Sequence, residues 1–143
     1  MVSPARAATP AGYSGTPLGQ KLGIKAGHRV SLVTAPAHIR DLIKPLPVGV
    51  TFVGTAAREL DIVMLFATAR SALVPAFAKA TARIATAGMV WVAWPKRSSG
   101  VATDLSETAV REIGLARGLV DVKVCAIDAT WSGHKFVRRL KDR

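Results

Sequence analysis

The fold is decided by the stretch "DIVMLFATARSALVPAFAKATARIATAGMVWVAW", which runs from Asp61 to Trp94. Its first part, "DIVMLFA" (61–67), is a continuous apolar run, as is typical of a strand buried on both faces of a sheet. A helix is predicted to begin at Ser71 and to end near Gly88, where a glycine can close the last turn. "MVWVAW" (89–94) then predicts the next strand. A strand, a helix and a second strand in this order predict parallel strands joined by a helical crossover.

The helix of this unit has an apolar stripe that should face the sheet, made of Leu73, Phe77, Ala80 and Ile84. Lys79 and Arg83 are expected elsewhere, on its surface. Trp91 and Trp94, in the second strand, are expected together on one sheet face under a helix.

Upstream of this unit, strands are predicted at 29–34 ("RVSLVT") and 50–54 ("VTFVG"), with a helix between them that Pro36 opens and Pro45 ends. The connection "TAAREL" (55–60) is shorter than the dozen or more residues that a parallel crossover usually needs. Either it forms a single helical turn, or the strand at 50–54 is misplaced.

Downstream, Asp104 and Glu107 have the spacing of a capping box, so a helix should begin there and end at Gly118. Strands are predicted at 120–127 and 134–140, joined by a short turn. The last strand should run antiparallel and insert beside the strands at 89–94 and 120–127.

Together these elements predict an α/β fold in three layers, with a mostly parallel sheet between helices and a C-terminal antiparallel strand. The 143 residues fit one domain, expected at 12–143. Residues 1–11, rich in alanine, proline and small polar types, are expected to form a disordered tail.

The composition is strongly basic, with 20 Lys and Arg against 9 Asp and Glu, a net charge of +11. Such an excess favours anionic partners, although it can also serve solubility alone. The single Cys125 excludes an internal disulfide and should act as a small buried hydrophobe in its strand. Without a secretory signal or an apolar run long enough to span a membrane, a cytoplasmic protein is expected.

In an open α/β sheet, ligands collect at the carboxyl ends of the parallel strands. The loops that leave the strands there are 34–40, 67–71, 95–104 and 128–135, and a helix N-terminus near Asp104 should point at the same space. We expect a positively charged concavity that binds an anion, or else plain connecting loops. Its predicted residues are Arg70, Lys96, Arg97, Ser98, Ser99, Thr103, Trp131, Ser132, His134 and Lys135, with His38 and Arg40 as further candidates.

Known catalytic and cofactor motifs are missing from this sequence. No glycine-rich phosphate loop follows the first strand, which continues as "TAPAH" (34–38), and no GxSxG elbow occurs. The three histidines lack metal-ligand spacing, so no metal is expected. Asp128 and His134 near Ser132 could form an acid–base pair, but turns often contain residues of these types.

Three segments, "GYSGTPLGQKLGIKAGHRV" (12–30), "WVAWPKRSSGVATDLSE" (91–107) and "GLVDVKVCAIDATWSGHKFVRR" (118–139), resemble a family of small bacterial proteins, the domain-of-unknown-function family 3052. The resemblance covers residues 12–139. It implies a Rossmann-like, methyltransferase-like fold but no established activity. The fold analogy suggests S-adenosylmethionine, yet "TAPAH" (34–38) and "VGTAA" (53–57) lack the usual glycines and ribose-binding carboxylate, so no cofactor is expected.

Three functions follow as hypotheses. The first is a non-catalytic module that binds an anionic partner at the loop edge, whether a nucleotide, RNA or an acidic protein, with Trp131 exposed and able to stack a base. The alternative is a transferase-type enzyme with a degenerate cofactor loop, in which Asp128 or His134 moves protons. An interaction scaffold is the third, and the oligomeric state stays open.

Overall fold

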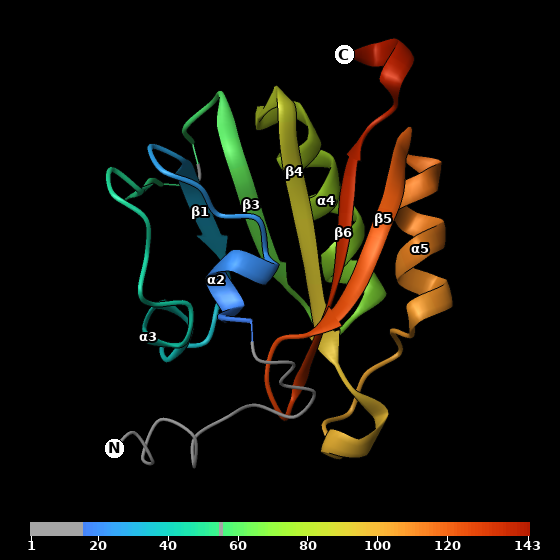
Figure 1. Cartoon of the computed structure of the whole chain (residues 1–143). Helices are drawn as coiled ribbons and strands as arrows, with labels where there is room; N and C mark the ends of the chain where they lie inside the picture. The colour runs from blue at the N-terminus through green and yellow to red at the C-terminus, as the bar shows by residue number, and fades with distance from the viewer. Residues whose placement is uncertain (1–15, 55) are drawn as a thin grey trace, which may run out of the picture.

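The structure is a computed structural model that describes residues 16–54 and 56–143, so the tail expected at 1–11 lies outside the described residues. One six-stranded sheet forms its centre, in the order β2–β1–β3–β4–β6–β5 (Figure 1). Its strands are β1 (Arg29–Val33), β2 (Thr51–Phe52), β3 (Leu60–Phe66), β4 (Ile84–Pro95), β5 (Leu119–Ala126) and β6 (Trp131–Arg138).

Strands β2, β1, β3 and β4 are parallel to one another, and β6 is the antiparallel member. It lies between β4 and β5, with Phe136 opposite both Val90 and Asp121. The predicted α/β class, and the insertion of the last strand between its two neighbours, are therefore confirmed. β6 starts at Trp131, three residues before the predicted strand, because the turn that precedes it is shorter than expected.

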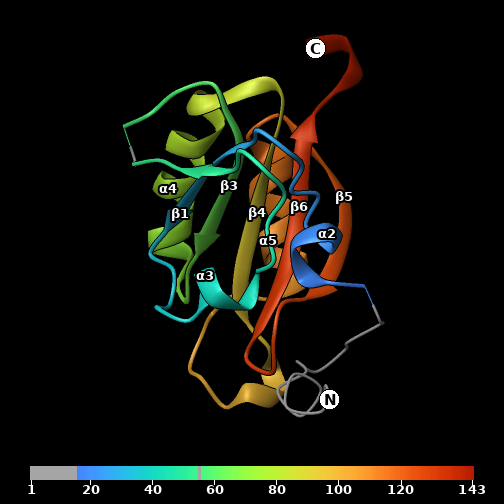
Figure 2. The same ribbon diagram turned by 60° about the vertical axis from the view of Figure 1, so that its left-hand side comes forward.

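The helices form two layers on opposite faces of the sheet (Figure 2). α2 (Leu18–Lys21) and α3 (Ile39–Leu42) cover one face, and α4 (Arg70–Arg83) and α5 (Glu107–Ala116) cover the other. Two short 3-10 turns, η1 (Arg97–Ser99) and η2 (Leu140–Asp142), complete the chain. None of the helices in the described part of the chain is long and apolar enough to cross a membrane.

Strand β3 is buried on both faces, as its apolar run predicted. Ile62, Met64 and Phe66 belong to the core under α2 and α3, whereas Val63 and Leu65 pack with Leu73 and Phe77 of α4. These strand residues are at most 4% exposed. The strand therefore supplies apolar side chains to both cores at once, which fixes it near the centre of the sheet.

Strand β4 is longer than predicted, because it begins at Ile84 directly after α4 rather than at Met89. Gly88 is not a helix end but an interior strand residue. A Cβ there would lie 2.5 Å from the carbonyl oxygen of Leu60, so glycine permits close contact between the two strands.

The prediction that Trp91 and Trp94 share one sheet face was also wrong. Trp91 belongs to the core under α2 and α3, and Trp94 belongs to the core under α4 and α5, because residues three apart in a strand face opposite sides.

Two connections differ from expectation. Helix α5 begins at Glu107, and its N-cap is Ser106, whose hydroxyl accepts a hydrogen bond from the Ala109 N–H at 3.1 Å; Asp104 has no part in this cap. β2 is only two residues long, and in the described residues between β2 and β3 no helix forms. Within residues 16–54 and 56–143 this connection therefore adds no helix to the face that α4 and α5 cover.

Candidate functional site

The loops at the carboxyl ends of the strands are joined to one another by hydrogen bonds. The backbone N–H of Lys96, after β4, donates to the carbonyl of Thr130 in the β5–β6 turn at 2.7 Å. The Arg70 N–H, at the start of α4, donates to Asp104 Oδ1 at 2.8 Å. Segments far apart in the sequence therefore meet at one edge, at the lower end of the sheet in Figure 1.

Four of the predicted binding residues lie at this edge with side chains that are not used elsewhere. Arg70, Arg97 and Ser98 are exposed and Lys96 is half-buried. None of the four side chains makes a salt bridge or hydrogen bond with another described residue. Arg40, a further candidate, makes a cation–π contact instead, with its guanidinium 4.2 Å from the centre of the Phe52 ring.

Three predicted hydroxyl residues stabilise the loops and strands instead. Ser99 Oγ donates to the Lys96 carbonyl at 2.7 Å, which closes the η1 turn. Thr103 Oγ1 donates to the Thr68 carbonyl at 2.5 Å and accepts from Leu105 N–H. Ser132 lies within β6, opposite Trp94. The sequence placed these residues at the correct edge, but it could not show that the hydroxyls of Ser99 and Thr103 form hydrogen bonds with neighbouring backbone groups.

The prediction that His134 and Lys135 lie in the edge loop was wrong, because β6 has already begun at Trp131. His134 is 1% exposed, stacks on Phe136 and has its Nε2 at 3.3 Å from Asp121 Oδ2. Lys135 points to the other face, towards α2. Burial lowers the pKa of Lys135, and the positive charges of Lys123 and Lys25 lower it further.

Trp131 is half-buried, and its ring packs edge-to-face on Phe66 with 5.2 Å between ring centres. The tryptophan that the sequence predicted to be exposed therefore packs, half-buried, against the core on the side of α2 and α3. Cys125 packs against the same core, and burial raises the pKa of its thiol, as expected for a structural cysteine.

The edge contains a histidine–carboxylate pair, but not the one of Asp128 with His134 that the sequence left as a possibility. Asp128 pairs with His38, from the loop after β1, at 2.9 Å between Oδ2 and Nε2, and not with His134. Burial raises the pKa of Asp128, but the hydrogen bond from His38 and those from the Trp131 and Thr130 N–H groups outweigh it and hold that pKa below its ordinary value. The two residues are ninety positions apart, so no local pattern could reveal the pair.

The His38 imidazole is accessible, with 55% of its side chain exposed. A carboxylate on one ring nitrogen fixes the orientation of the imidazole, as in catalytic histidine–aspartate pairs. Within residues 16–54 and 56–143, no group of three metal-binding side chains occurs.

Comparison with known proteins identifies the fold. No family model and no curated protein matches the chain. Solved structures do match: precorrin-6y C5,15-methyltransferase of Geobacter metallireducens GS-15 is 11% identical over 85% of this chain and 86% of its own, with a TM-score of 0.56. The DhpI–SAH complex is 13% identical over 87% and 83%, with a TM-score of 0.60. Magnesium protoporphyrin IX methyltransferase (ChlM) of Synechocystis PCC 6803 with bound SAH is 7% identical over 85% and 78%, with a TM-score of 0.54.

The protein thus has the Rossmann-like fold of these methyltransferases, and at such identities the similarity concerns the fold alone. The edge residues do not fit S-adenosylmethionine in the usual way. Thr34, directly after β1, has the left-handed backbone that a glycine adopts easily (φ 56°), but Ala35 and Pro36 follow it and α3 is a single turn. After β2, Val53 and Gly54 offer no carboxylate to a ribose.

Proposed function

We propose that the protein is a ligand-binding protein with a methyltransferase-like fold, and that its carboxyl edge holds an anionic ligand. The observation that carries the proposal is the position of Arg70, Lys96 and Arg97 on loops that are hydrogen-bonded together at that edge. The two carboxylates beside them, Asp104 and Asp128, already accept hydrogen bonds from backbone N–H groups or from His38. Three cations with uncommitted side chains favour a phosphate or carboxylate ligand.

A nucleotide or another small phosphorylated molecule suits this edge better than RNA does. Single-strand binders combine cationic residues with exposed aromatic rings on which bases stack. Trp131, the aromatic residue expected to serve in this way, packs against Phe66. Membership of the unknown-function family and a cytoplasmic location stay predictions.

A second candidate function is a transferase, and the His38–Asp128 pair favours it. The solved neighbours also support this candidate better than the first, because they are methyltransferases and some are described with bound SAH. In such an enzyme His38 would take a proton from the attacking group of an acceptor, and Asp128 would stabilise the resulting imidazolium. The absent glycines and ribose carboxylate count against it.

Calorimetry with pyrophosphate and with S-adenosylhomocysteine separates the two candidates. The first predicts saturable pyrophosphate binding that weakens at least about tenfold in the Lys96→Ala/Arg97→Ala double variant, with a shallower salt dependence and an unchanged melting temperature. An Arg139→Ala/Lys141→Ala double variant removes the same charge from the exposed C-terminal segment and should bind as the wild type does.

Equal weakening in both double variants would mean that net charge alone attracts the anion, and would refute the proposed site. Micromolar binding of S-adenosylhomocysteine would support the transferase instead. In that case His38→Ala should abolish methyl transfer while leaving the binding of S-adenosylhomocysteine nearly unchanged.

A further inference from the structure

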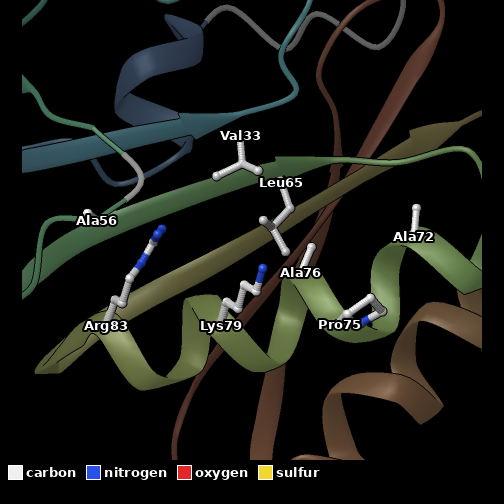
Figure 3. Close-up of a pocket in the computed structure, with 8 residues that line it drawn as sticks. All are labelled: Val33, Ala56, Leu65, Ala72, Pro75, Ala76, Lys79 and Arg83. Carbon is white, nitrogen blue, oxygen red and sulfur yellow. The ribbon is translucent and has the colours of Figure 1, made fainter.

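A cavity of about 470 Å³ lies between α4 and the sheet, and runs from the carboxyl end of β1 along α4 (Figure 3). Its walls are mainly apolar and come from four parts of the chain: Val33 of β1, Leu65 of β3, Ala56 of the β2–β3 connection, and Ala72, Pro75 and Ala76 of α4. Lys79 and Arg83 of α4 complete the lining. The volume is within the range of about 300–1,000 Å³ that is common for small-molecule sites.

The cavity exists because the connection between β2 and β3 contains no helix in its described residues. α5 contacts β5 and β6, and α4 contacts β3 and β4, so the face of β1 on this side has no helix against it. Val53 and Ala57 from the connection cover only part of that face. Small side chains along α4, above all Ala72 and Ala76, leave the remaining space open.

The sequence predicted Lys79 and Arg83 on the surface of α4; Lys79 is indeed exposed and Arg83 is half-buried, and both line this cavity. They are one helical turn apart, and in Figure 3 both side chains extend from α4 towards the sheet. No carboxylate of residues 16–54 or 56–143 lies in salt-bridge range of either. The only acidic residues on the strand and connection beside them are Glu59, which is exposed, and Asp61, which accepts from the Arg29 N–H at 2.8 Å.

Two other arginines near the end of α4 donate hydrogen bonds to backbone carbonyl groups there, which sets Arg83 apart. Arg58 Nη1 donates to the Ala82 carbonyl at 3.1 Å, and Arg138 Nη2 donates to the carbonyls of Thr81 and Ile84 at 2.9 and 3.0 Å. These bonds satisfy carbonyl groups at the helix end. Arg83 Nε is buried, yet it finds no acceptor within the described chain. A buried donor on a charged group is costly to leave unpaired, so an anion beside it would be stabilised strongly.

A second buried polar group lies on the same face of the sheet. Ser31 is 0% exposed, and its Oγ has no hydrogen-bond partner among the described residues. Because strand side chains alternate, Ser31 and Val33 of β1 share one face. The face of β1 towards α4 thus carries an apolar side chain and a hydroxyl group without a hydrogen-bond partner among the described residues.

We infer that the cavity is a binding site for a small amphipathic anion, a molecule with an apolar body and one carboxylate or phosphate head. The body would lie against Val33, Leu65 and Ala76, and the head would accept hydrogen bonds from Arg83 and Lys79. Arg83 lies at the opposite end of α4 from Arg70 of the carboxyl edge, and the inference does not depend on the function proposed there.

Calorimetry with octanoate, octyl phosphate and octanol tests this inference on the full chain. We expect saturable 1:1 binding of at least one of the two anions, and binding of octanol that is about tenfold weaker because it lacks the charge. The preferred anion tells a carboxylate ligand from a phosphate ligand. Arg83→Met should weaken anion binding about tenfold and leave octanol binding unchanged, whereas Ala76→Leu should weaken all three by filling the cavity.

Controls keep this result distinct from the first site and from unfolding. Arg117→Gln removes one exposed positive charge from the turn after α5 and should have no effect, as should the Lys96→Ala/Arg97→Ala double variant. Each variant is first checked by its melting curve, and Lys79→Met replaces Arg83→Met if the latter does not fold. Binding that is absent for both anions, or equal for octanol and the better-bound anion, or unaffected by Ala76→Leu, would overturn the inference.

Discussion

Replacing Gly114 by alanine tests the packing of α5 against the sheet. In an isolated helix, glycine to alanine stabilises by about 1 kcal/mol, so helix propensity alone predicts a more stable protein. In this structure a Cβ at position 114 would overlap the Phe136 ring, with Cδ2 at 2.5 Å and Cζ at 2.7 Å. Carbon atoms that are not bonded normally lie about 3.5–4.0 Å apart, so the ring or the helix must move by about 1 Å.

The Phe136 ring has no free space into which it could move. It is 0% exposed, lies edge-to-face with Phe77 at 5.4 Å between ring centres, and stacks on His134 at 4.7 Å. Overpacking of a well-packed core costs about 1–3 kcal/mol, and this site is expected at the upper end. After the propensity gain is subtracted, the free energy of unfolding should fall by about 1–2 kcal/mol. At about 4 °C per kcal/mol for a domain of this size, the melting temperature falls by about 4–8 °C.

Thermal and urea unfolding, followed by circular dichroism, measure this change. Thr108→Ala is the matched control, because it improves propensity at an exposed position of the same helix and should raise the melting temperature slightly. In a Phe136→Leu background, Gly114→Ala should cost less, since the smaller side chain gives the new methyl group room. A rise in the melting temperature of Gly114→Ala would show that α5 does not pack on Phe136 as described.

Two further predictions concern a helix cap and a crowded lysine. Ser106→Ala should lower the free energy of unfolding by about 1 kcal/mol because it removes the hydroxyl that accepts a hydrogen bond from Ala109 N–H. Ser98→Ala, the control, should change this free energy little. Equal urea midpoints for the two variants would contradict the assignment of Ser106 as the N-cap. Lys135→Met should stabilise the protein at pH 7, because the folded state lowers the pKa of this lysine and so disfavours its charged form. The gain in the free energy of unfolding should shrink as the pH rises towards 10.5, where the lysine becomes neutral in the unfolded chain too. A Lys135→Met variant that is less stable than the wild type at pH 7 would contradict this prediction.

Much of the fold could be predicted from the sequence because the signals were local. The apolar run of β3, the positive-φ glycine at Gly118 after α5 and the closing hairpin each depend on neighbouring residues. The approximate positions of six strands and two long helices followed from such patterns. The carboxyl edge as the meeting place of the loops also followed, since parallel strands end on the same side.

The site residues could be predicted only in part, because chain proximity does not determine which partner a polar side chain finds. Asp104 has suitable chemistry to cap α5, but the Arg70 N–H, 34 positions away, takes its carboxylate, and Ser106 caps the helix instead. Asp128 pairs with His38 rather than with the nearer His134, because a strand turns the side chain of His134 into the core.

The sequence by itself determined the order of strands and helices, the antiparallel last strand and the positive charge, because periodicity and turn chemistry act over a few residues. Only the tertiary structure decided where β4 begins, since Gly88 suits either a helix end or a close strand contact and the carbonyl of Leu60 selects the second. It also decided that Arg83 is half-buried and lines a cavity. That outcome depends on a helix that the β2–β3 connection does not form, and so on the packing of segments that no local pattern brings together.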